Sequence, residues 1–152
     1  MTILYRILGS IVNVVALLLS ISVILSIPMI LSSPLTMLSG FMMVAIILYA
    51  WFSTQFNRKV LQQQQVVGKR LKDLVKVNGI VAIIFSIVVI VDVVMLIGDP
   101  QAYINVIKGL GVEMPLKTIT SFLYVMLGYG VVLLTHVIWT LLLIRKHSLY
   151  FQ

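Results

Sequence analysis

Residues 77–97 read VNGIVAIIFSIVVIVDVVMLI, a run in which Asp92 is the only charged side chain. A helix rises about 1.5 Å per residue and the hydrocarbon layer is about 30 Å thick, so roughly 20 apolar residues cross it. A run rich in Val and Ile could form a buried strand in water, but strands are rarely this long. The stretch therefore predicts a helix that spans a membrane.

Three further runs meet the same requirement, at residues 7–27, 35–54 and 116–144. The first resembles a signal peptide, but it is too long and no small-residue cleavage site follows it, so we expect it to be retained. Hydrophobic residues make up 61% of the 152-residue chain and charged residues only 10%, far more apolar surface than a water-soluble core could bury. We predict an all-α integral membrane protein, a four-transmembrane-helix bundle that forms one domain over residues 1–148.

The connections between the spans differ in character. A basic loop covers residues 55–76, and an outer loop at 98–115 has the capping residues of a short surface helix from Pro100 to Lys108. The last four residues, Leu149 to Gln152, look like the end of a protease recognition sequence from a purification tag, and we leave them out of the functional analysis.

Lys and Arg are distributed unevenly between the two sides of the predicted membrane. One side carries nine: Arg6, six in the basic loop, Arg145 and Lys146; the other carries Lys108 and Lys117. Positive residues are retained on the cytoplasmic side. This predicts that the basic loop and both termini are cytoplasmic, and we expect the membrane to be the bacterial inner (plasma) membrane.

Several function classes find no support in the residues. The net charge of +7 accompanies no soluble basic face, so we expect no nucleic-acid partner. The chain has no cysteine and no recognisable catalytic motif, and His147, the only histidine besides His136, lies beyond the last span. We therefore expect no enzymatic activity, no cofactor and no metal site.

Ionisable residues inside a span are costly in lipid and are candidates for function. Asp92 lies in the outer half of its span, and Tyr124, Ser121 and Ser22 lie at comparable depth in other spans. A hydrogen-bonded cluster of these four would satisfy the carboxyl group. Alternatively Asp92 faces a water-filled cavity or an oligomer axis, where it could bind a cation or relay protons, or it simply reaches interfacial water or stays protonated.

A second polar pair is predicted in the inner leaflet. His136 and Asn13 lie at similar depth in the last and first spans. Polar pairs between membrane helices typically contribute about 0.6 kcal/mol, so we expect this pair to hold the helices together.

The basic loop has amphipathic helical spacing. Its pattern fits either a helix lying in the headgroup plane or a helical hairpin broken near Gly68. Its cations either fix the topology alone or also contact anionic lipid or a soluble protein partner. The candidates for such contact are Arg58, Lys59, Lys69, Arg70, Lys72 and Lys76.

Two functions follow from these observations. A bundle of four helices has its interior filled by side chains, so transport would need an oligomer. The leading hypothesis is a small homo-oligomeric channel, transporter or sensor for an ion or small solute, with Asp92 as its key polar residue. The alternative is a non-transporting scaffold or accessory subunit whose basic loop binds lipid or a protein.

Overall fold

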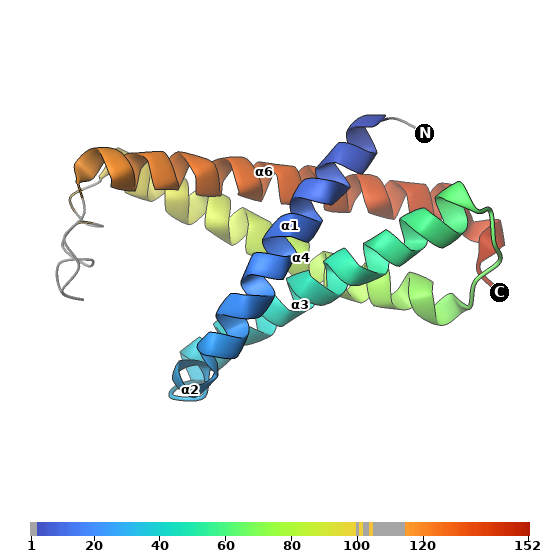
Figure 1. The fold of residues 1–152 in the computed structure, drawn as a ribbon, viewed down its shortest axis with the longest axis horizontal. Coiled ribbons are helices and arrows are strands. Elements are labelled where there is room, and N and C mark those ends of the chain that lie inside the picture. The colour runs from blue at the N-terminus through green and yellow to red at the C-terminus, as the bar shows by residue number, and fades with distance from the viewer. Residues whose placement is uncertain (1–2, 100, 102–103, 105–114) are drawn as a thin grey trace.

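Long helices dominate the structure, a computed structural model that describes residues 3–99, 101, 104 and 115–152 (Figure 1). They are α1 (Ile3–Leu25), α3 (Pro34–Phe56), α4 (Lys69–Gly98) and α6 (Leu116–Lys146). Within the described residues these four are long and apolar enough to cross a membrane, and no strand is present beyond one isolated bridge. The predicted all-α membrane bundle is confirmed. The predicted helix from Pro100 to Lys108 lies outside the described residues except Gln101 and Ile104, which are helical.

The turn between α1 and α3 is fixed by capping and close packing. The single turn α2 (Ile27–Ile30) follows α1, and then Ser33 caps α3. The Ser33 hydroxyl accepts from the Thr36 backbone N–H at 3.3 Å, and the Ser33 N–H donates to Thr36 Oγ1 at 3.1 Å. Gly40 lies against α2, where an added Cβ would come within 2.5 Å of Ile30. These contacts hold α1, α2 and α3 together as one hairpin.

At the other end of α3 the chain forms a second tight connection. The helix continues as the π-helical segment η1 (Asn57–Gln62), turns at Gln64 with φ of 52°, and re-enters a helix at Lys69 after Gly68. The basic loop is thus a helical hairpin, the second of the two arrangements that its sequence allows. We call this end of the molecule, with residues 57–68 and the end of α6, the basic end.

The last residues of the chain lie against this hairpin. After the short helix η2 (Ser148–Tyr150), Phe151 is buried with its ring stacked on Phe56 at 6.0 Å between centroids. The Val67 N–H donates to the Tyr150 carbonyl at 2.8 Å, and the Gln152 N–H donates to the Val67 carbonyl at 3.1 Å. The segment with the tag-like sequence is therefore part of the packing at the basic end.

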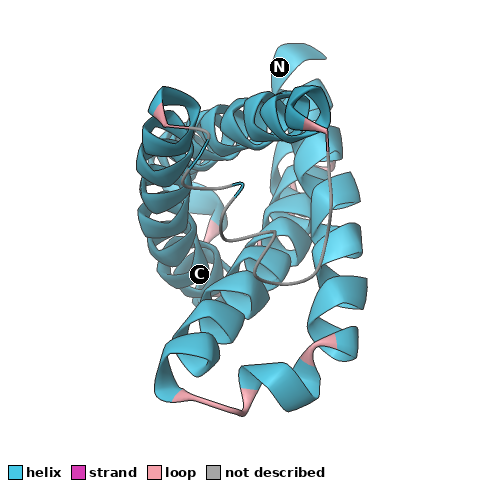
Figure 2. Cartoon of the chain, turned by 90° about the vertical axis from the view of Figure 1, so that its left-hand side faces the viewer, coloured by secondary structure: helices cyan, strands magenta, loops and turns pink. Residues whose placement is uncertain are grey.

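The four long helices form two hairpins that meet in one half of the molecule. Helix α4 packs along α6, α3 packs on α4, and α1 crosses to contact both α3 and α6. A common core joins them, with Val12, Ile46, Ala82 and Leu133 each contributed by a different helix. Towards the opposite end the hairpins diverge, and α2 lies well away from the far ends of α4 and α6 (Figures 1 and 2). There α4 and α6 share a separate small core.

Candidate functional site

A buried hydrogen-bond network joins three helices in the half of the molecule nearer the basic end. Thr140 of α6 is its centre, because its Oγ1 lies 2.9 Å from the hydroxyl of Tyr5 on α1 and 2.9 Å from that of Tyr49 on α3. The Tyr49 hydroxyl also lies 2.9 Å from His136 Nδ1. All four side chains are buried, so the network connects α1, α3 and α6 through polar groups that have no access to lipid.

Counting protons in this network fixes the tautomer of His136. The Thr140 hydroxyl donates its only proton to the His136 carbonyl at 2.8 Å, so it accepts from both tyrosines. Tyr49 has then used its proton on Thr140, and its oxygen must accept from His136 Nδ1–H. In the neutral imidazole the other nitrogen, Nε2, is therefore a bare acceptor.

The position of the imidazole is fixed by packing as well as by hydrogen bonds. The Tyr5 ring stacks on it with centroids 4.9 Å apart. Gly9 of α1 lies close to the edge of the imidazole that carries Nε2, where an added Cβ would lie 3.2 Å from that atom. A side chain at position 9 would press on the imidazole, so glycine there allows α1 to cross α6 at this point.

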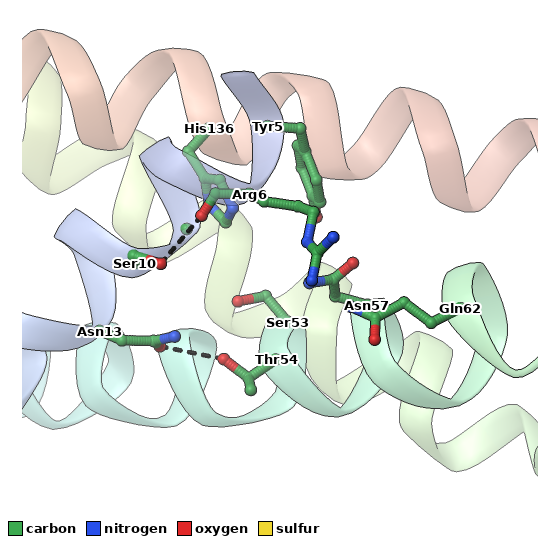
Figure 3. Close-up of a pocket in the computed structure, with 10 residues that line it drawn as sticks. Tyr5, Arg6, Ser10, Asn13, Ser53, Thr54, Asn57, Gln62 and His136 are labelled. Carbon is green, nitrogen blue, oxygen red and sulfur yellow. Dashed lines mark hydrogen bonds between the residues drawn. The ribbon is translucent and has the colours of Figure 1, made fainter. Parts of the chain in front are cut away.

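A polar cavity of 230 Å³ adjoins this network, and we call it the chamber. Figure 3 shows side chains from α1, α3 and α6 converging on it. Its lining residues are Tyr5, Arg6, Gly9, Ser10, Asn13, Ser53, Thr54, Asn57, Gln62 and His136. The space is large enough for several water molecules or a small solute.

The chamber has a buried floor and an exposed rim. Tyr5, Ser53 and His136 are buried, whereas Arg6 and Gln62 are exposed. The rim residues belong to the first turns of α1 and to η1, both towards the basic end (Figure 1). The chamber thus opens at the basic end, and the exposed Ser10 and Thr54 leave it open also between α1 and α3.

Two groups in the chamber have unmet bonding capacity. The guanidinium of Arg6 forms no ion pair with any described residue. The Oδ1 atom of Asn57 is buried and has no hydrogen-bond partner among the described residues. A cation without a counter-ion among the described residues, beside an unused acceptor, suits a ligand that brings both a negative charge and a donor.

The inner-leaflet residues predicted to pair, Asn13 and His136, both line the chamber but bond to different partners. Asn13 Oδ1 accepts from the Thr54 hydroxyl at 3.0 Å, and His136 bonds to Tyr49. The reason is that α3 supplies a partner to each of them, Thr54 to Asn13 and Tyr49 to His136. The two residues therefore join α1 and α6 to α3 and not directly to each other.

The residues predicted to cluster in the outer leaflet are spread over the surface. Asp92, Tyr124, Ser121 and Ser22 are all exposed, and no hydrogen bond joins any two of them in the described part of the chain. Ser22 belongs to the α1 hairpin, which diverges from α4 and α6 at this level (Figure 1). Asp92 faces outwards from α4 and has no partner among the described residues.

The basic residues of the hairpin lie around three separate grooves. Arg58 and Lys59 line one with Trp51, and Lys59 and Arg70 line another. A third groove holds Lys72 and Lys76. Lys69, at the start of α4, donates its backbone N–H to the Gln152 carbonyl at 3.2 Å.

Several chamber residues were not predicted from the sequence, although a signal for them exists. Arg6, Ser10 and Asn13 follow the spacing of four and three residues that places side chains on one face of a helix. Ser53 on α3 and Asn57, the first residue of η1, are likewise four residues apart. Two polar faces at the same end of two apolar helices indicate a polar space between the helices. The pattern becomes visible only when the two spans are compared with each other.

No protein-family model, no curated protein and no solved structure matches this chain.

Proposed function

We propose that this multi-pass membrane protein binds a small anionic solute in the chamber and, as a homo-oligomer, transports or senses it. The observation that carries the proposal is the Arg6 guanidinium, which lines a polar cavity without a counter-ion among the described residues. An exposed rim lets a solute reach this cation, and contact with the buried floor removes part of the water that hydrates the solute. The chamber has a binding role in this proposal and no catalytic one.

The chemistry of the lining narrows the class of solute. Arg6 favours a carboxylate or phosphate, while the unused acceptors Asn57 Oδ1 and His136 Nε2 favour an O–H or N–H donor on the same molecule. Hydroxy acids, amino acids and partly protonated phosphate carry both features. Chloride carries only the charge, so it should bind less well.

Asp92 supports the oligomeric part of the proposal. It lies six residues before the end of α4, about 9 Å along the helix, and its side chain is exposed with no partner among the described residues. A carboxyl group facing hydrocarbon costs several kcal/mol. Contact with a second copy, or with water held between copies, would remove that cost.

The proposed orientation places the chamber in reach of cytoplasmic solutes. The rim of the chamber is at the basic end, and basic flanks are retained on the cytoplasmic side. Both termini are then cytoplasmic, as we propose for a bacterial inner membrane.

Binding and flux by the purified protein test this function. Lactate, glycine and inorganic phosphate serve as probes that combine an anionic group with a donor. Arg6→Gln should weaken binding about tenfold or more, because a hydrogen bond to a charged group contributes about 1.5–3 kcal/mol. Lys146→Gln is the matched control, since Lys146 is an exposed cation at the same end that lines none of these cavities.

Flux into reconstituted vesicles separates the two parts of the proposal. Both Arg6→Gln and Asp92→Asn should abolish flux while the oligomer stays intact by light scattering. If Arg6→Gln behaves like Lys146→Gln, the chamber is not the solute site. Equal flux in wild type and Asp92→Asn would remove Asp92 from the mechanism, and a monomeric wild type would remove the oligomer.

A second function is favoured by the grooves around the basic hairpin. Three grooves lined by cations at one end suit a scaffold or accessory subunit that contacts anionic lipid or a soluble protein. Under this alternative the variants of Arg6 and Asp92 would leave binding to anionic lipid or to the protein partner unchanged.

A further inference from the structure

A groove of 630 Å³ lies between the basic ends of α4 and α6. It is separate from the chamber, which lies among α1, α3 and α6. Its lining includes Lys72, Lys76 and Ile80 from α4 and Leu141, Arg145 and Ser148 from α6 and the residues that follow it. Cations occupy one end of this lining and apolar side chains the other.

The cations of the groove are not neutralised by the described part of the chain. Neither lysine forms an ion pair with a described residue, and neither does Arg145. Three positive groups around one groove create a strong local attraction for an anion.

Apolar side chains continue from the groove along the two helices. Ile80 is 55% exposed, and Ile84 and Ile87 follow it on the same side of α4, also exposed. On α6, Ile138 is exposed one turn beyond Leu141. A free anion would gain nothing from these side chains, whereas a molecule with an acyl chain would bury them.

We propose that this groove binds an anionic phospholipid. Its phosphate lies between Lys72, Lys76 and Arg145, with the Ser148 hydroxyl as a further donor, and its acyl chain follows Ile80 along α4. Basic pockets between membrane helices on the cytoplasmic side are suited to acidic headgroups. The proposal does not depend on the solute function; it rests on the lipid-contact alternative, for which it names one groove and one ligand.

Native mass spectrometry of the detergent-purified protein, with equal amounts of phosphatidylglycerol and phosphatidylcholine, tests this inference. The wild type should retain phosphatidylglycerol selectively. The triple variant K72Q/K76Q/R145Q should lose about a hundredfold in affinity, since each nearby cation strengthens binding about fivefold. The matched control R58Q/K59Q/R70Q removes three charges from the same end without altering this groove, and it should bind as the wild type does.

Further variants keep the test decisive if the triple variant folds poorly. Arg145→Gln alone should weaken binding about fivefold, and K72R/K76R/R145K should keep it. Equal losses in the two triple variants would show that only the total charge matters, and equal retention of phosphatidylcholine would show that the headgroup is not recognised. Displacement of the lipid by an equal concentration of glycerol phosphate would show a site for free phosphate. Each of these three results would overturn the proposal.

Discussion

Thr140 is the residue on which the interior polar network depends, through its hydroxyl group. It accepts from Tyr5 and Tyr49 while it donates to the His136 carbonyl. The sequence marks the last span as unusually polar, but it does not reveal these partners. Tyr5 lies 135 positions away in the chain, and the crossing of α1 over α6 brings the two together.

Replacing Thr140 by Val should destabilise the protein by about 1–2 kcal/mol. The change keeps the side-chain shape but removes the acceptor for two buried hydroxyl groups, and each polar contact between membrane helices contributes about 0.6 kcal/mol, up to about 1.7. Thermal unfolding in detergent measures the effect. Thr140→Ser keeps the hydroxyl and serves as the control, and a Val variant as stable as the Ser variant would show that the network contributes nothing.

At the scale of helices, glycine sets how closely α4 and α6 approach. An added Cβ at Gly130 would lie 3.0 Å from Ile90 Cγ1 of α4, whereas at Gly128 it would meet nothing within 4 Å. Gly130→Ala should therefore press on the Ile90 side chain and lower the unfolding temperature, since overpacking typically costs about 1–3 kcal/mol. Gly128→Ala is the control in the same helix. Equal unfolding temperatures for the two variants would contradict the close packing.

The spans could be predicted from the sequence because hydropathy is a local property of the chain. The pairing of helix faces could not, because apolar residues surround each helix and lipid-facing positions look like buried ones. Leu17 on α1 is 62% exposed although it is as apolar as the buried Val12. The divergence of the two hairpins, which separates Ser22 from Asp92, therefore has no signature in hydropathy.

For the whole molecule, the arrangement of the two hairpins creates one polar space at the basic end. Charge inside a span is conspicuous in the sequence and points to Asp92, yet the structure concentrates its interior polar contacts around His136 and Thr140. The chamber combines residues from α1, α3 and α6 that are individually unremarkable. The property that we propose for it, access from the cytoplasm to a depth well inside the membrane, depends on this assembly.

Thiol labelling tests that property most directly, because the chain contains no cysteine of its own. Asn13 lines the chamber ten residues into α1, about 15 Å along the helix, while its neighbour Val14 is 62% exposed on the outer surface. Only a thiol in contact with water ionises and reacts. In oriented vesicles Asn13→Cys should react with a small membrane-impermeant reagent added on the cytoplasmic side, and Val14→Cys should not. Labelling of Asn13→Cys only from the opposite side, or no more labelling than Val14→Cys, would contradict a chamber open to the cytoplasm.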